Sequence, residues 1–341
     1  MDFIKIDGEF GEGGGQIIRT AITLSCITKQ PIIIENIRKN RKIPGLKAQH
    51  ITAIKILQKI CDAEVEGAKM GSTNLKFIPR DVKSCNLIEN IGTAGSISLV
   101  LQVLIPVVAI CKKKLNLKIK GGTDTLWSPT IDYTRYVLRE AYSRMGINFS
   151  IRLIKRGYYP KGGGEVNLDV LPSNVKSISL NQRKTKNIKL FCSFSNLPNE
   201  LIKKLVDEIQ KKITEKKFIV QTQINEESAI DSGASLLIFS VDEESIIGID
   251  SILDKKTERF DLDLESFTEN NLGVDEHLAD MLVLPASLTN EMTIFRVRNI
   301  SKHLETNLFV TSKITGCKYG IGKLSNGFEI RIEGVLNTSI K

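Results

Sequence analysis

Imidazole chemistry in this chain could come from three residues, His50, His277 and His303. His303 follows Lys302 at the start of an expected helix. At that place a histidine either caps the helix or, as a neutral imidazole, attacks an electrophilic phosphorus atom. Basic neighbours such as Lys302 would lower its pKa and keep a lone pair free at neutral pH. The spacing of the histidines resembles no metal site.

Three more side chains are candidates for binding a polar ligand. His277 and Asp280 are three residues apart, so they share one face of an expected helix. Negative charge at that helix start either stabilises the helix dipole or contacts a ligand. Gln102 interrupts an otherwise apolar helix, and its amide needs a partner. It either bonds a neighbouring backbone group or binds a polar edge of a ligand.

Glycine-rich and basic turns supply candidates for phosphate binding. Gly13 to Gly15 open an apolar helix, and Glu12 and Arg19 flank that turn with opposite charges. Glycines let the backbone approach a ligand, and helix N-termini favour anions, although such a run is also common in plain tight turns. Arg38 and Arg41 lie in a turn that ends at residues 44–45. Their guanidinium groups suit phosphate, but an ordinary exposed turn also accepts them.

Composition sets the class of protein. The 341 residues carry 48 Lys plus Arg against 39 Asp plus Glu, a net charge of +9. That excess suits an anionic partner such as nucleic acid or nucleotide, unless the lysines are merely solvated. The longest apolar run, 97–111, is shorter than the ~20 residues that a membrane span needs, and the start lacks a leader pattern. We therefore expect a cytoplasmic protein with no membrane partner. None of the six cysteines forms a C-x-x-C pair, which argues against a zinc ribbon or disulfide scaffold.

One order of elements recurs three times: a glycine turn, a helix, a strand, a polar turn and a second helix. The helix, strand and second helix are expected at 16–28, 31–37 and 46–61, then at 97–111, 115–119 and 131–145, and finally at 278–288, 292–298 and 304–315. The repeat predicts three βα units with helices covering sheet faces. A second triple glycine, 162–164, falls between closing strands of the second copy, so we expect a hairpin or bulge there.

Residues 177–272 break the repeat and predict an inserted small α/β domain. Its expected elements are strands 188–194 and 235–241 and a helix 199–215. The catalytic domain would then comprise residues 1–176 and 273–341. The turns of the three copies should occupy equivalent ends of their units and gather one site from distant residues: Glu12, Arg19, Arg38, Arg41, Gln49, Gln102, His277, Asp280 and His303.

These residues lie in stretches that closely resemble the RNA 3′-terminal phosphate cyclases. The matching stretches are DGEFGEGGGQIIR (7–19), IRKNRKIPGLKAQH (37–50), GTAGS (92–96) with Gln102, GGTD (121–124), RGYYPKGGGE (156–165), EHLAD (276–280) and KHLETN (302–307). They follow the family's order along nearly the whole chain except 177–272, which is far more specific than any single glycine run.

The resemblance implies an α/β (α+β) fold of three units like the carboxy-terminal domain of translation initiation factor three, plus the inserted domain. It implies ATP-dependent conversion of an RNA 3′-terminal phosphate to a 2′,3′-cyclic phosphodiester, through a covalent histidine–AMP intermediate and an RNA-adenylate. RNA with a 3′-terminal phosphate and ATP would be its partners, with Mg²⁺ or Mn²⁺ as cofactor. The family makes a homodimer plausible, although no residue pattern here demonstrates one.

The family's site residues carry over position by position. His303 matches the nucleophile that forms the histidine–AMP adduct. The ATP-contacting positions correspond to Gln102, His277, Leu278, Ala279, Asp280 and Met281. The positions near ATP or RNA phosphates correspond to Arg19, Arg38, Arg41 and Gln49, and Glu12 corresponds to a metal ligand. His277 departs from the tyrosine of some relatives, but stacking on adenine would survive that change.

Two other functions remain open at this point. A non-catalytic relative that binds RNA in ribosome assembly would keep the fold and the basic surface but lose the nucleophile. His303 is present, which favours the enzyme. A carboxyvinyl transferase of the shikimate-pathway type has a related repeated architecture, but the stretches quoted above do not resemble it.

Overall fold

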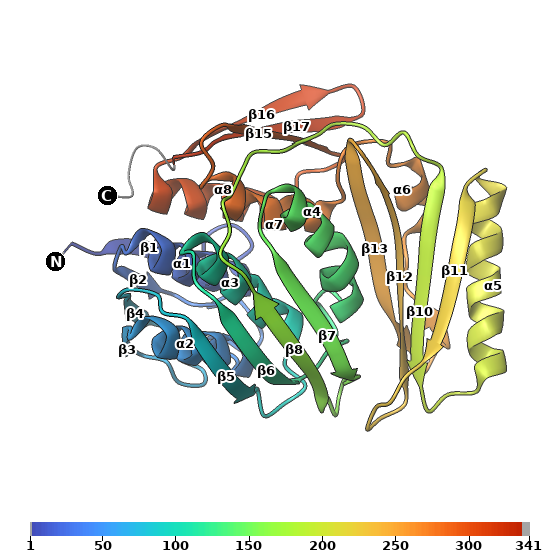
Figure 1. The fold of residues 1–341 in the computed structure, drawn as a ribbon, viewed down its shortest axis with the longest axis horizontal. Helices are drawn as coiled ribbons and strands as arrows, with labels where there is room; N and C mark the ends of the chain where they lie inside the picture. Colours follow the sequence, from blue (N-terminus) through green and yellow to red (C-terminus); the bar gives the residue numbers. More distant parts are fainter. Residues whose placement is uncertain (1, 336–341) are drawn as a thin grey trace.

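In the computed structural model, which describes residues 2–335, a mixed α/β fold contains three four-stranded sheets and one five-stranded sheet (Figure 1). The mixed α/β class expected from the sequence is confirmed. None of the helices within residues 2–335 combines the length and the apolar character needed to cross a membrane.

The three four-stranded sheets share one strand order: first, second, fourth, third. Their strands, in that order, are β1 (Ile4–Asp7), β2 (Ile32–Glu35), β4 (Leu75–Ile78) and β3 (Glu64–Glu66); β5 (Cys85–Asn90), β6 (Leu115–Gly121), β8 (Gly164–Val170) and β7 (Phe149–Lys155); and β9 (Ser179–Leu180), β15 (Met292–Val297), β17 (Gly327–Glu333) and β16 (Lys318–Leu324). In each sheet the first two strands are parallel and the remaining pairs antiparallel. The first connection therefore needs a crossover helix.

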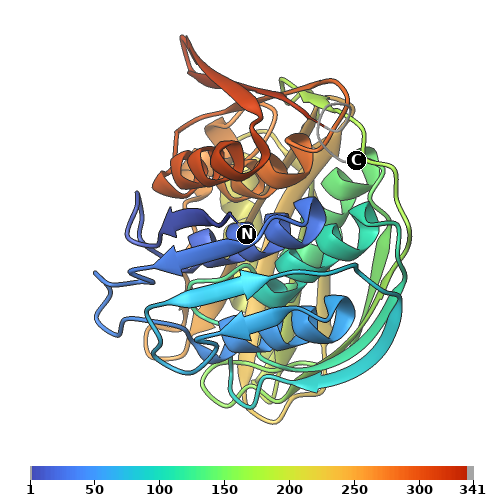
Figure 2. The ribbon, with the colours of Figure 1, turned by 90° about the vertical axis from the view of Figure 1, so that its left-hand side faces the viewer.

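Paired helices cover these sheets. They are α1 (Gly15–Thr28) and α2 (Ala48–Cys61), then α3 (Ile97–Ile110) with the π-helix η1 (Tyr133–Leu138) and α4 (Arg139–Arg144), and finally α7 (Glu276–Ala286) and α8 (Lys302–Thr315). α1 lies at the centre, where it packs on α2, α3 and α8. Figure 2 shows the blue strands of the first unit and the red strands of the third stacked one above the other. Alternating burial along β6 and β8 gives their sheet one face on this common core.

The five-stranded sheet has the order β11 (Ile219–Glu226), β10 (Asn187–Ser195), β12 (Gly233–Asp242), β13 (Ser245–Asp254) and β14 (Arg259–Phe260). Helices α5 (Asn199–Glu215) and α6 (Leu264–Glu269) pack on it and share a second hydrophobic cluster with it. In Figure 1 this sheet stands at the right, with α5 on its outer side. Leu237, Phe239 and Ile246 instead join the main core, so the sheet is buried on both faces.

One expectation from the sequence needs correction, and the expected boundary at residue 177 stays a prediction. The single helix expected over 131–145 is η1 followed by α4, because the Arg139 N–H donates to the Thr134 carbonyl five residues back. The short strand β9 lies within the stretch 177–272 assigned to the insertion, yet it pairs with β15 of the third unit. A boundary at residue 177 would thus separate β9 from its own sheet. The triple glycine 162–164 lies at the β7–β8 hairpin, as expected.

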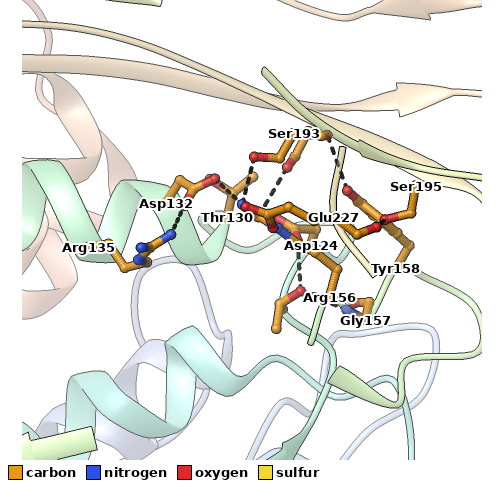
Figure 3. A network of polar contacts seen from close by, with 12 residues as sticks. Asp124, Thr130, Asp132, Arg135, Arg156, Gly157, Tyr158, Ser193, Ser195 and Glu227 are labelled. Atoms are coloured by element: carbon orange, nitrogen blue, oxygen red, sulfur yellow. Dashed lines mark hydrogen bonds and ion pairs between the residues drawn. The ribbon is translucent and has the colours of Figure 1, made fainter. Parts of the chain in front are cut away.

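A buried arginine connects the second unit to the five-stranded sheet (Figure 3). The side chain of Arg156 is fully buried, and its guanidinium donates to the carboxylates of Asp124, Asp132 and Glu227. It also donates to the hydroxyl of Ser193 in β10, at 2.8 Å. Burial alone would lower the pKa of Arg156, but the carboxylates raise it well above its ordinary value. The guanidinium therefore stays charged and joins the two parts.

Candidate active site

The triple glycine at the start of α1 makes room for three polar side chains. A Cβ atom on Gly14 would collide with the carboxylate of Glu12. A Cβ atom on Gly15 would lie 2.5 Å from His50 Nε2 and 3.0 Å from Arg19 Nη1. The run is thus required by close packing of functional groups around the helix start, in addition to the turn that Gly13 makes at a φ of 59°.

Helix α8 brings His303 to the same place. Ser301 caps α8 by accepting the Leu304 N–H at 3.0 Å, which leaves His303 in the first turn. The hydroxyl of Thr306, one turn later, accepts the backbone N–H of Glu12 at 3.2 Å. This bond fixes the glycine turn against α8, although the two segments are far apart in sequence.

Glu12 stands between a cation and the imidazole. Its carboxylate forms an ion pair with Arg41, whose guanidinium also reaches the Glu12 carbonyl at 3.3 Å. The second carboxylate oxygen, Oε2, lies 3.7 Å from His303 Nδ1. A carboxylate on that side favours the tautomer that carries its proton on Nδ1 and leaves the Nε2 lone pair free.

The electrostatics of the site keep His303 neutral. Burial lowers the pKa of the imidazole, and Arg19, His277 and Arg41 lower it further by disfavouring a second positive charge nearby. The side chain is nevertheless 44% exposed, so a substrate can reach it. An uncharged, accessible imidazole among cations can attack an electrophile that carries negative charge.

A hydrogen-bond network behind this cluster joins α1, α7 and α8. The side chain of Asn307 accepts from the Thr20 hydroxyl at 2.6 Å and from the Gln16 amide at 3.1 Å. Its own amide donates to the Asp280 carbonyl at 2.9 Å. Gln16 in turn accepts from the guanidinium of Arg19. The side chains of Gln16, Thr20 and Asn307 thereby find partners, and the network fixes the three helices relative to one another.

A small cavity opens beside this network. Its volume is ≈ 30 Å³, and it is lined by Gln16, Arg19, Thr20, Thr23, Gln102, Tyr142, Asp280, Met281, Leu284 and Asn307. Gln102 Nε2 lies 3.6 Å from the Met281 sulfur, a weak acceptor. The Nε atom of Arg19 is buried without a hydrogen-bond partner among residues 2–335. Unsatisfied donors at a cavity wall are suited to a polar ligand.

Asp280 and Arg19 are both perturbed by burial. Burial raises the pKa of Asp280 to about 7, although the Ser301 hydroxyl donates to its carboxylate at 2.9 Å and lowers it in part. Burial lowers the pKa of Arg19 to about 10, and Asp280 opposes that shift. Perturbed groups beside a cavity are typical of functional sites.

The structure places the other predicted site residues around this centre. His277 is exposed in the first turn of α7, with its ring edge-on to Tyr133 at 6.2 Å between centroids. The side chains of Leu278 and Ala279 are instead buried in the hydrophobic core, so only their backbone could reach a ligand. Gln49 accepts the Ser96 N–H at 3.4 Å, which joins the starts of α2 and α3.

Arg38 and His50 lie behind the glycine turn. The Arg38 guanidinium donates to the Gly45 carbonyl at 3.2 Å. His50 accepts the Lys47 N–H on Nδ1, so its proton must be on Nε2, which faces α1. Burial, Arg19, Arg38 and Lys47 lower the pKa of His50 to about 3. It is therefore a neutral packing partner of the active site.

One side chain of the candidate site, Glu12, is suited to bind a metal ion. Among residues 2–335 no three His, Cys, Asp or Glu side chains cluster as a metal site. The Oε2 atom of Glu12 is buried without a hydrogen-bond partner in that part of the chain. Mg²⁺ commonly takes one or two carboxylates together with substrate phosphates, and a single carboxylate beside a phosphate site suits that pattern.

The network residues Gln16, Thr20 and Asn307 are not among the predicted site residues. One signal could have found the first two, because Gln16 and Thr20 are polar and share a face of a helix with many apolar residues. The same reasoning identified Gln102 in α3. Asn307 gives no such signal, since its importance depends on contacts with two other helices.

Comparisons of this chain with known proteins identify a matching family. A family model described as RNA 3′-terminal phosphate cyclase matches residues 10–321. A protein of that name from Methanosarcina barkeri is 38% identical over 333 residues, which is 96% of this chain and 99% of the relative. Another, from Saccharolobus solfataricus, is 39% identical over an alignment of 341 positions that covers 96% of this chain and 99% of the relative. The resemblance inferred from the sequence motifs is confirmed, and this chain belongs to the RNA 3′-terminal phosphate cyclase family.

Proposed function

We propose that this protein is an ATP-dependent ligase-class enzyme that converts an RNA 3′-terminal phosphate to a 2′,3′-cyclic phosphodiester, with His303 as nucleophile. One observation carries the proposal: a neutral, accessible imidazole stands among Glu12, Arg19 and Arg41 at the junction of α1 and α8. The names of the relatives support the overall reaction.

In the first step, Nε2 of His303 attacks the α-phosphorus of ATP, and the bond from that phosphorus to the bridging oxygen breaks. AMP becomes attached to the histidine, and pyrophosphate leaves. Arg19 and Arg41 offset the charge on the transferring group. Because the Nδ1 side faces Glu12 at 3.7 Å, that carboxylate stabilises the positive charge which the ring acquires.

In the second step, an oxygen of the RNA 3′-phosphate attacks the adenylyl phosphorus and expels His303, which regains its lone pair. The adjacent 2′-hydroxyl then attacks the activated 3′-phosphorus, AMP leaves, and the hydroxyl proton passes to His303. The nucleophile and the phosphorus belong to one molecule, where effective molarities can reach ~10⁵ M. The protein therefore needs only to hold the RNA end in place for this last step.

The adenosine would bind between the start of α7 and α3. His277 offers a ring face for adenine, and Gln102 offers an amide whose present partner is only a sulfur atom. Asp280 and Met281 line the adjoining cavity, while Leu278 and Ala279 would contribute through their backbone. Gln49 and Arg38 lie farther back and suit phosphates that extend beyond the site. The side chains around the ≈ 30 Å³ cavity must move apart to admit a base.

Glu12 would hold Mg²⁺ or Mn²⁺, which when bound supplies further neutralisation of phosphate charge. For this, the Glu12 carboxylate must exchange its ion pair with Arg41 for the metal. The freed guanidinium then binds a phosphate oxygen.

A labelling experiment tests the proposal. Incubation with Mg²⁺ or Mn²⁺ and ATP labelled at the α-phosphate should leave an acid-labile, alkali-stable label on the protein, and His303→Ala should abolish it. Glu305→Ala is the matched control, because Glu305 is an exposed residue of the same first turn of α8. If the folded wild-type protein acquires no label with either metal, the proposed enzymatic function is overturned in favour of a non-catalytic RNA-binding role.

A further inference from the structure

Four loops meet at the end of the molecule where the helices begin. The loop 121–130 pairs with the loop 156–163, because the Tyr159 N–H donates to the Asp124 carbonyl at 3.1 Å. The Arg156 N–H reaches the Ser228 carbonyl of the loop after β11 at 2.9 Å. Gly162 lies against Ala94 of the turn before α3, where a Cβ would be 2.8 Å from the Ala94 Cα. These loops therefore form one continuous surface.

Large apolar side chains project from this surface. Trp127 is 92% exposed and Tyr159 is 48% exposed. Leu126 is exposed in the loop of Trp127, and Ile230 is exposed in the loop after β11, where it lies against Gly163. We call these four residues the Trp127 rim. Tryptophan usually buries most of its surface, so nearly complete exposure costs free energy. A group of exposed apolar side chains commonly marks a binding surface.

The backbone of Trp127 is also held in an unfavourable conformation. Its φ is 60°, in the left-handed region that bulky residues rarely adopt. The loop is nevertheless fixed on both sides: Thr125 and Ser128 share a hydroxyl hydrogen bond of 2.7 Å, and the Thr130 N–H donates to Asp250 at 2.6 Å. The structure thus directs the indole into solvent, and such strain clusters at functional sites.

The loop that carries Trp127 is linked to residues of the candidate site at both of its ends. Asp250, which holds the Trp127 loop, lies within electrostatic reach of His277. On the other side, Ser96 pairs with Gly122 at the base of the loop and is bonded to Gln49 at the start of α2. The Trp127 loop is therefore close to His277 on one side and to Gln49 on the other, two of the residues assigned to the candidate site.

Basic side chains lie in the loop before α2 and in one of the loops that carry the rim. The loop before α2 carries Arg38, Arg41 and Lys47, and Arg41 touches Glu12 in the active site. Lys161, in the same loop as Tyr159, is exposed and forms an ion pair with Asp231 at 3.6 Å. A polyanion that ends at His303 could follow this basic segment toward the aromatic side chains. Aromatic faces next to basic groups are the combination that binds single-stranded nucleic acid.

We propose that the Trp127 rim stacks unpaired bases of the RNA upstream of its 3′-phosphate, so that the substrate class is RNA with a single-stranded 3′ end. The inference rests on the proposed cyclase function. A duplex keeps its bases stacked on one another, so only an unpaired tail can offer base faces to Trp127 and Tyr159. Stacking accepts any base, and the rim therefore adds affinity without sequence preference.

Trp127 is the single tryptophan of the chain, so its fluorescence reports directly on the rim. Titration with a single-stranded RNA of about ten nucleotides that ends in a 3′-phosphate should quench the emission. A blunt duplex with the same 3′-phosphate should leave it nearly unchanged. Equal quenching by the duplex, or none by the single strand, would overturn the proposal.

Variants separate the rim from the chemistry. Trp127→Ala should raise the Kd for the single strand roughly tenfold, and Trp127→Phe should restore most of the affinity, because phenylalanine also stacks. Tyr159→Ala should weaken binding in the same direction. Tyr319→Ala is the matched control, since Tyr319 is a similarly exposed tyrosine beyond the opposite end of α8 from His303.

Labelling by ATP and binding of RNA distinguish a failure of the Trp127 rim proposal from a failure of the proposed cyclase function. The histidine adduct forms without RNA, so Trp127→Ala should still acquire label from ATP. A labelled Trp127→Ala protein with an unchanged Kd for the single strand would overturn the rim and leave the cyclase function standing. If Trp127→Ala instead converts a dimer to a monomer in sedimentation, the surface belongs to a second copy of the chain and the proposal is overturned.

Discussion

At the scale of single residues, the candidate site works by setting the charge of one imidazole. His303 would be a poor nucleophile if protonated, and its burial near Arg19 and Arg41 lowers its pKa. Guanidinium groups also suit phosphate, so in the proposed reaction one set of charges would both prepare the nucleophile and bind the substrate. Glu12 keeps the ring oriented from the opposite side, 3.7 Å from Nδ1.

This arrangement predicts the pH dependence of Arg41→Gln. Adduct formation requires neutral His303, so its rate falls as pH drops through the pKa of the imidazole. Removing the charge of Arg41 raises that pKa, and the acidic limb of the profile should therefore move to higher pH. The rate at neutral pH should also fall about tenfold or more, because a phosphate contact is lost. Single-turnover labelling across a pH series measures both effects.

Arg41→Lys serves as the control for this prediction. Lysine keeps the positive charge but loses the planar fork, so the rate should fall while the acidic limb stays near its wild-type position. An acidic limb that moves to lower pH in Arg41→Gln would contradict the electrostatic account of His303.

At the scale of elements, the start of α1 predicts the effect of Gly15→Ala. The new methyl group would lie 2.5 Å from His50 Nε2 and 3.0 Å from Arg19 Nη1, so one of these side chains must shift. Overpacking of this kind costs about 1–3 kcal/mol of the free energy of unfolding, which urea denaturation measures. Displacement of Arg19 should also slow adduct formation.

Gly320→Ala is the comparison for Gly15→Ala. Gly320 lies in β16, and apart from its chain neighbours no heavy atom of the described residues lies within 4 Å of the place that a Cβ atom would take. Its φ is not in the left-handed region. Its substitution should leave the free energy of unfolding nearly unchanged. Equal effects of the two substitutions would show that the space around Gly15 is not tightly filled.

The elements also show how far the sequence could predict the fold. The helix expected over 199–215 has those bounds, because its apolar residues recur at helical spacing over one long face. The helix expected over 131–145 is divided, since tertiary contacts such as Tyr133 with Asp275 favour the π-helical turn. Strand β9 has two residues and gains its identity only by pairing with distant β15. Local patterns carry no information on such pairings.

The candidate site, too, could be predicted from the sequence only in part. Motifs and charge identified Glu12, Arg19, Arg41 and His303, and the structure brings these four together. The partners of Asn307 depend on how α1, α7 and α8 cross, which sequence spacing does not determine. The grouping of other site residues likewise required the packing of helices from different units.

At the scale of the whole molecule, the five-stranded sheet is coupled to the three-unit body. One of its faces packs with α5 and α6 in a separate cluster, but Leu237, Phe239 and Ile246 complete the main core. The rings of Phe191 and Phe239 also stack on Tyr136 of η1, with centroids 4.8 and 5.8 Å away. The five-stranded sheet therefore stabilises the second unit and, through the Arg156 network, supports the loop that carries Trp127.

That coupling predicts the effect of removing Arg156. In Arg156→Ala, the carboxylates of Asp124 and Asp132 would remain buried without their counter-charge, which costs about 3–5 kcal/mol of the free energy of unfolding. Arg156→Lys should recover little of this stability, because one ammonium cannot reproduce the guanidinium's bonds to three carboxylates (Figure 3).

Arg80→Ala is the control, since Arg80 and its partner Glu64 are both exposed and their pair contributes little. Urea denaturation of the three variants measures the differences. A loss in Arg156→Ala no larger than that in Arg80→Ala would mean that the sheet and the body are held together by apolar packing alone.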